Sequence, residues 1–206
     1  MSISLRDLKL NELFYITGVE ESYLNIRKAV TRVFKELKDK GEFSFAELIE
    51  HLRKLSSDTS GAPKQLKDSA AKAINYMERL QDLTILGDKS FDVRDFLKPK
   101  TVSVIDLSGL SDRESDLIAY FVLKEIFKLK MLPTEQGYKY PVFVFIEEAH
   151  RFIPPPALGD TYSGGFIKKI AAEGRKFGIF LTLVTKGLPR FIPTFSASAV
   201  AKSSCR

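Results

Sequence analysis

Two adjacent carboxylates, Glu147 and Glu148, follow directly on an apolar run of β-branched and aromatic residues, 142–146. Such a run is typical of a strand that is buried on both faces of a parallel sheet. In open α/β sheets, ligands bind at the carboxyl ends of the strands, which is where this pair falls. One carboxylate there can hold Mg²⁺ through water, and its neighbour can take a proton from an attacking water. The alternative is a strand that ends in a solvated acidic pair.

Two sequence segments together resemble a known family. The first reads Ile-Glu-Glu-Ala-His-Arg-Phe over residues 146–152, and the second reads Glu-Gly-Arg-Lys-Phe-Gly over residues 173–178. In this order and near this spacing they resemble the HerA family of archaeal and bacterial hexameric DNA translocases, which are relatives of the FtsK motors. A weaker match is the run Val102–Asp106 with Leu-Ser-Gly-Leu after it. The resemblance extends to about Lys186.

The resemblance implies a motor ATPase that processes DNA ends, with ATP and Mg²⁺ as its cofactors. Glu147 would order Mg²⁺ through water as part of a Walker B element, and Glu148 would polarise the attacking water. Arg175 would be an arginine finger that reaches the nucleotide of a neighbouring subunit, a role that contributes on the order of 10³–10⁵ in turnover. The alternative for Arg175 is a surface arginine at a helix end, where a cation suits the dipole. DNA, a partner nuclease and a homo-hexamer are implied as well.

The phosphate-binding part of such a motor is not present in the sequence. No Gly-x-x-x-x-Gly-Lys-[Ser/Thr] loop occurs in it. That loop supplies the amides and the lysine that cradle the phosphates of a nucleotide. We therefore expect an internal piece of a motor that begins after the phosphate loop and is inactive alone. Two alternatives remain open, a non-catalytic helical binding module and a decayed gene product.

The sequence departs from the family again after Lys186. The family continues with an Arg-Pro-Ser run and, further on, a Leu-Ser-Gln-Cys stretch. The reading frame can be shifted so that each new codon takes the last base of one residue's codon and the first two bases of the next. In that frame the gene can encode Arg-Pro-Ser across 186–189 and Leu-Ser-Gln-Cys across 195–199. We infer a one-base loss near codon 186. Residues 187–206 would then be an aberrant tail with little regular structure.

Composition limits the remaining classes of protein. No apolar run approaches the roughly 18 residues that a membrane span needs, and the first residues lack the apolar core of a signal peptide. Cys205 is the one cysteine, so an internal disulfide framework is excluded. These observations predict a cytoplasmic protein without a membrane partner. The net charge is +6, but residues 1–173 are formally neutral, so the charge does not indicate a basic DNA-binding stripe.

The predicted fold class is α/β, a partial RecA-like parallel sheet with an N-terminal helical module. Apolar stripes at helical spacing and a capping box at Ser44–Glu47 predict helices in residues 1–98. In residues 99–186, strands at 102–106, 142–146 and 179–185 alternate with helices, one of which follows the capping box Ser111–Glu114. Alternation of this kind favours parallel strands joined by right-handed crossovers. Glu147 and Glu148 would then end a central strand.

Overall fold

The computed structural model describes residues 2–41, 43–87, 89–133, 135–155 and 159–185. The chain divides into two compact units, Met1–Asp92 and Val93–Arg206. Helices and short parallel strands make up both units, which confirms the α/β class. The predicted divisions after residues 98 and 186 stay predictions, and the tail 187–206 lies outside the described residues.

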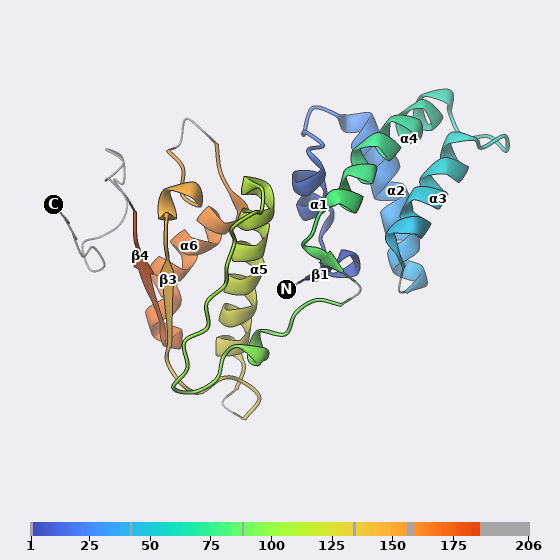
Figure 1. Cartoon of the computed structure of the whole chain (residues 1–206). Coiled ribbons are helices and arrows are strands. Elements are labelled where there is room, and N and C mark those ends of the chain that lie inside the picture. The colour runs from blue at the N-terminus through green and yellow to red at the C-terminus, as the bar shows by residue number, and fades with distance from the viewer. Residues whose placement is uncertain (1, 42, 88, 134, 156–158, 186–206) are drawn as a thin grey trace. The chain divides into compact units, whose positions relative to one another are not determined.

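The first unit is a helical module, as the apolar stripes predict (Figure 1). Its helices are α1 (Leu10–Thr17), α2 (Leu24–Lys40), α3 (Phe45–Ser56) and α4 (Lys64–Met77), with 3₁₀ turns η1 (Leu5–Asp7) and η2 (Glu78–Asp82). Helices α2, α3 and α4 pack against one another. The capping box that starts α3 is confirmed, because Ser44 and Glu47 exchange side-chain and backbone hydrogen bonds.

The two ends of this unit are joined by a small sheet that the sequence did not indicate. Strand β1 (Ile3–Ser4) pairs in parallel with β2 (Leu86–Gly87). The Ile3 N–H donates to the Ile85 carbonyl at 2.7 Å, and the Phe91 N–H donates to the Ser2 carbonyl at 2.9 Å. Ile3 is fully buried. The pairing of β1 with β2 therefore buries apolar surface and also joins the two ends of the helical unit.

The turn between α3 and α4 is held by the Asp58 carboxylate. It accepts the Ser60 hydroxyl at 2.5 Å, the Ser60 N–H at 2.8 Å and the Ala62 N–H at 2.9 Å. These donors, those of Ser60 first, lower the pKa of Asp58 to about 2. A carboxylate in an unfolded chain has a pKa of about 3.9. The turn is therefore stabilised at pH values above about 4, and this contribution is lost as the pH falls through about 2.

We accordingly expect an NMR titration of the Asp58 carboxyl carbon to give a midpoint of about 2. Ser60→Ala removes the hydroxyl donor, so the midpoint should move toward the ordinary pKa of about 3.9. A midpoint near 3.9 in the unaltered chain would contradict the hydrogen-bonded turn.

The second unit places its helices on one face of a two-stranded parallel ribbon. Its elements are η3 (Val93–Asp95), α5 (Asp112–Met131), β3 (Val142–Ile146), η4 (Ala149–Arg151), α6 (Tyr162–Glu173), η6 (Gly174–Phe177) and β4 (Ile179–Leu183). Strands β3 and β4 are parallel, with Val142 opposite Ile179 and Ile146 opposite Leu183. Helix α5 packs against α6, and α6 packs against β4 (Figure 1). The second predicted capping box, at the start of α5, is also confirmed.

A buried carboxylate joins α5 to the start of α6. Asp116 of α5 is 2% exposed. It accepts the Tyr162 N–H at 2.9 Å, the Ser163 N–H at 3.0 Å and also the Ser163 hydroxyl. The first turn of a helix leaves N–H groups without partners inside the helix. Asp116 therefore satisfies donors that would otherwise be buried without an acceptor.

Two predictions about the strands are wrong. Residues 101–107 form no strand, and Val102 and Val104 are 92% and 86% exposed. This segment makes hydrogen bonds to residues close in sequence instead. The Ser103 hydroxyl donates to the Phe96 carbonyl, and the Ser108 N–H donates to the Asp106 carboxylate. A β-rich sequence needs a partner strand and a packing surface before it forms a strand.

The second correction concerns β3, which was predicted to be buried on both faces. Its residues alternate instead, with Val142 and Ile146 buried and Phe143 and Phe145 exposed. The reason is that α5 and α6 cover one face, and none of the described residues covers the other. Glu147 and Glu148 therefore do not end a central strand.

No helix of the described residues is both long enough and apolar enough to span a membrane.

Candidate functional site

The acidic pair lies at the carboxyl end of β3, beside the end of β4. Backbone bonds continue the pairing past the last strand residues. The Val184 N–H donates to the Ile146 carbonyl at 2.9 Å, and the Ala149 N–H donates to the Val184 carbonyl at 2.9 Å. These two bonds fix the turn that carries Glu147 and Glu148 against the neighbouring strand. The expected position at the carboxyl edge of parallel strands is what the structure shows.

The backbone at Glu148 has a left-handed conformation, with φ of +47° and ψ of 43°. Residues other than glycine adopt this region at a free-energy cost of about 1 kcal/mol or more. The turn redirects the chain into η4, leaving Glu147 exposed and Glu148 half-buried. Strain of this kind often accompanies functional side chains, and here it falls on the residue expected to polarise water.

His150 and Thr185 contact this turn, and the sequence did not assign either to the site. The His150 Nδ1 lies 3.2 Å from the Thr185 Oγ1 and 3.4 Å from the Glu148 Oε2. Thr185 follows β4 and Glu148 follows β3, so two parallel strands bring these residues to one edge of the ribbon. That shared edge is the signal that could have predicted the contact.

A salt bridge joins the same turn to the first turn of α5. The Arg151 guanidinium lies 2.8 Å from the Asp112 carboxylate. The Asp112 side chain is 89% exposed, so this pair contributes only about 0–1 kcal/mol to stability. We expect it to orient the turn rather than to hold the unit together.

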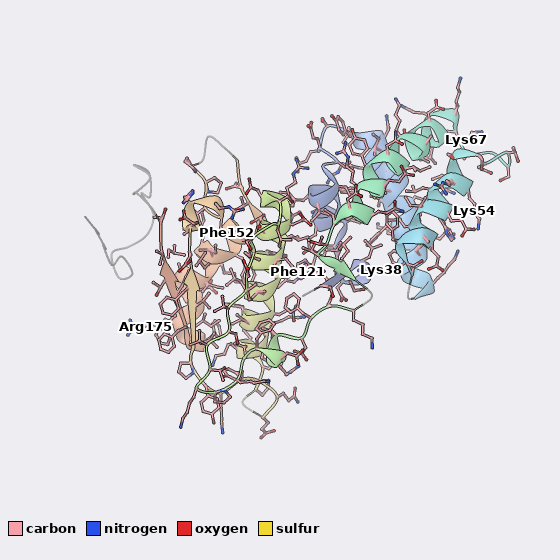
Figure 2. The ribbon with its side chains drawn as sticks, in the orientation of Figure 1. Lys38, Lys54, Lys67, Phe121, Phe152 and Arg175 are labelled. Atoms are coloured by element: carbon pink, nitrogen blue, oxygen red, sulfur yellow. The ribbon has the colours of Figure 1, made fainter. Side chains whose placement is uncertain are left out.

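Arg175 lies at the other end of the ribbon. It belongs to η6, which is separated from β4 by the single residue Gly178, and its side chain is exposed (Figure 2). The acidic pair follows the last residue of β3, which is parallel to β4. A strand of this length spans about 17 Å. One copy of the chain therefore does not bring Arg175 and Glu148 together.

The glycines on either side of Arg175 have packing roles. A Cβ at Gly174 would meet the Ile170 Cγ2 at 2.9 Å and the Ile179 carbonyl oxygen at 3.1 Å, so the end of α6 approaches β4 closely. Gly178 has φ of +68°, a conformation that favours glycine. Close packing accounts for Gly174 and backbone conformation for Gly178, but neither accounts for the exposed arginine.

The described residues do not fit an ATP–Mg²⁺ complex by themselves. They contain no group of three or more His, Cys, Asp or Glu side chains that could hold a metal ion. Mg²⁺ in nucleotide sites is bound by one or two carboxylates together with the phosphates. Glu147 provides one exposed carboxylate, but the sequence contains no phosphate loop to hold a nucleotide beside it.

Comparison with known families decides the relationship. A sequence model described as the central domain of the helicase HerA matches residues 1–126, more than half of the chain. The chain belongs to this family. The match covers the helical unit and most of α5, and it ends before Glu147 and Glu148.

Curated relatives named DNA double-strand break repair helicase HerA agree with this assignment. The protein of Sulfurisphaera tokodaii is 32% identical over 175 residues, which cover 80% of this chain and 35% of the relative. The protein of Sulfolobus acidocaldarius is 28% identical, with 90% and 41% covered, and that of Saccharolobus solfataricus is 26% identical, with 89% and 37% covered. The chain thus spans less than half the length of these HerA relatives.

Proposed function

We propose that the chain is a fragment of a HerA-like DNA translocase ATPase that carries the Walker B acidic pair and does not turn over ATP alone. The observation that carries this proposal is the position of Glu147 and Glu148 at the carboxyl end of β3, beside the parallel strand β4. Family membership supports the motor class. The inactivity follows from the sequence, which contains no phosphate loop.

In an assembled motor, Glu147 is the residue proposed to order Mg²⁺ through water, and Glu148 is the proposed general base. The strained backbone at Glu148 and its contact with His150 support this assignment. Arg175 is the proposed arginine finger. Because it lies at the opposite end of the ribbon from Glu148, it fits a role toward the nucleotide of another subunit. DNA, a partner nuclease and a homo-hexamer are proposed for the intact motor.

A second candidate function is a non-catalytic binding module formed by the helical unit. The family match supports this alternative, because it covers residues 1–126 and stops before the acidic pair. DNA, motor subunits and a partner nuclease are the candidate targets of that module. Only the first of the two functions requires the Glu148 carboxylate for ATP hydrolysis, so substitution of this residue distinguishes them.

The first test is thermal unfolding of the chain with Mg-ATP. A ligand at 100 times its Kd stabilises a protein by about 2.7 kcal/mol. For a chain of this size that corresponds to a rise in Tm of about 5–10 °C. We expect no shift of this kind, because nothing in the sequence cradles the phosphates. A reproducible rise of that size would contradict the proposal.

The second test supplies the missing part. A polypeptide of the same family that carries the phosphate loop and its strand is added, and ATP hydrolysis is measured. We expect turnover to appear and Glu148→Gln to reduce it by about 10²-fold or more, as for loss of a general base. Glu125→Gln is the control, since this carboxylate pairs with Lys128 on the surface of α5. Turnover that Glu148→Gln leaves unchanged would instead favour the non-catalytic module.

A further inference from the structure

Charge is unevenly distributed over the first unit, although residues 1–173 are formally neutral. Helix α2 carries six lysine and arginine residues against two carboxylates. Three of these cations, Lys28, Arg32 and Lys35, are spaced four and three residues apart, so they lie along one face of the helix. All three are exposed. These three side chains are called the α2 row below.

The α2 row lies on the side of the helix opposite the core. Val30, Val33 and Leu37 are buried, and their positions fall about half a helical turn from the row. Helices α3 and α4 both pack against α2. Lys38, at the end of the helix in Figure 2, is not part of the row, because its ammonium lies over the Phe34 ring, 5.6 Å from the centroid. The row itself therefore faces solvent.

Carboxylates nearby do not neutralise the α2 row. Glu36 of the same helix pairs with Lys40 at 2.8 Å, and Glu50 of α3 pairs with Lys54 at 2.6 Å. Among the described residues, no ion pair or hydrogen bond reaches the charged groups of the row. Asp39 is exposed one turn beyond the row and limits it at the carboxyl-terminal end of α2. Three positive charges are thus left facing solvent side by side.

We propose that the α2 row binds the phosphate backbone of duplex DNA without reading its sequence. The proposal rests on the helical binding module described above and does not involve Glu147 or Glu148. A helix rises 1.5 Å per residue, so the row is about 10 Å long from Lys28 to Lys35. A strand of DNA carries one phosphate per about 3.4 Å of helix axis. About three phosphates therefore face three cations.

The composition of this surface favours duplex DNA over other acidic partners. Protein interfaces are centred on apolar and aromatic anchors and are depleted in lysine. Leu24, which is 64% exposed, is the one large apolar side chain that α2 exposes. Single-stranded nucleic acids bind by stacking on aromatic rings, and Phe34, the one aromatic residue of α2, is 2% exposed. The backbone of a duplex, by contrast, is bound through cations alone.

The test is fluorescence anisotropy of the full chain with two labelled duplexes of unrelated sequence, in the absence of ATP. At about 50 mM salt we expect a dissociation constant on the order of 10 µM for both duplexes. Three phosphate contacts release about three counterions, so a rise from about 50 to 200 mM salt should weaken binding about 40-fold.

Replacement of all three cations of the α2 row by glutamine should raise the dissociation constant about 10-fold or more. It should also reduce the slope of log K against log salt by about three, one for each lost phosphate contact. The control is the triple variant Lys54→Gln, Lys72→Gln and Lys128→Gln. It removes the same net charge from exposed positions on α3, α4 and α5, and it should bind nearly as the unaltered chain does. Thermal unfolding shows that each variant is folded.

No measurable binding at about 50 mM salt would overturn the proposal. An equal loss in the control variant would overturn it too, because net charge rather than the α2 row would then be responsible. Tighter binding of a single strand of the same length would refute the duplex as the ligand. Displacement of the duplex by poly-glutamate at equal charge concentration would instead indicate an acidic protein partner. Neither ATP nor Glu148 takes part, so failure here is distinguishable from failure of the proposed ATPase role.

Discussion

Replacement of Asp116 by alanine is expected to lower the free energy of unfolding of the second unit by about 3 kcal/mol. The carboxylate is 2% exposed and accepts the N–H groups of Tyr162 and Ser163 together with the Ser163 hydroxyl. Alanine would leave these donors at the start of α6 without an acceptor. Loss of a helix cap alone costs about 0.5–2 kcal/mol, and burial of unsatisfied donors adds to that.

The measurement is thermal or urea unfolding, in which a loss of about 3 kcal/mol lowers Tm by about 6–12 °C. Asp112→Ala is the matched control. It removes an aspartate of the same helix whose side chain is 89% exposed and pairs with Arg151, so a loss of no more than about 1 kcal/mol is expected. Equal effects of the two substitutions would show that Asp116 does not cap α6.

Neighbouring glycines of α6 are expected to respond to alanine with opposite signs. A Cβ at Gly164 would lie 2.5 Å from both the Phe152 carbonyl oxygen and the Thr161 Oγ1. Thr161 cannot move freely, because its hydroxyl donates to the Phe152 carbonyl and accepts the Gly164 N–H. We expect Gly164→Ala to cost about 2–3 kcal/mol through overpacking.

A Cβ at Gly165, by contrast, would meet nothing within 4 Å. Alanine is favoured over glycine in a helix by up to about 1 kcal/mol, so Gly165→Ala should stabilise the unit slightly. The measurement is denaturant unfolding of both variants, with their midpoints compared. Equal midpoints would mean that α6 does not approach Phe152 as closely as the structure shows.

Local signals in the sequence predicted the helices well. The capping boxes at Ser44 and Ser111 are satisfied within four residues of chain, so neighbours alone determine them. The apolar run 142–146 was also sufficient to predict β3, since its β-branched and aromatic residues favour a strand wherever a partner strand is available.

Contacts between distant residues were not predictable in the same way. The run Val102–Asp106 has strand composition, yet no described strand pairs with it, and composition cannot show whether a partner exists. The same limit applies to the site. Glu147 and Glu148 follow a strand, as predicted, but that strand is not central among the described residues, and the contact of His150 with Thr185 joins residues 35 positions apart.

The pairing of β1 with β2 has a consequence for synthesis on the ribosome. Ile3 cannot meet its partner Leu86 until that residue has been translated and has left the exit tunnel. At about 5–20 residues per second, translation from Ile3 to Leu86 alone takes roughly 4–17 s. During that interval the buried residues Ile3, Leu5 and Leu8 have no completed unit to pack against. A nascent chain halted before Leu86 leaves the tunnel would therefore be a better target for chaperones and proteases than one halted after Leu86 has emerged.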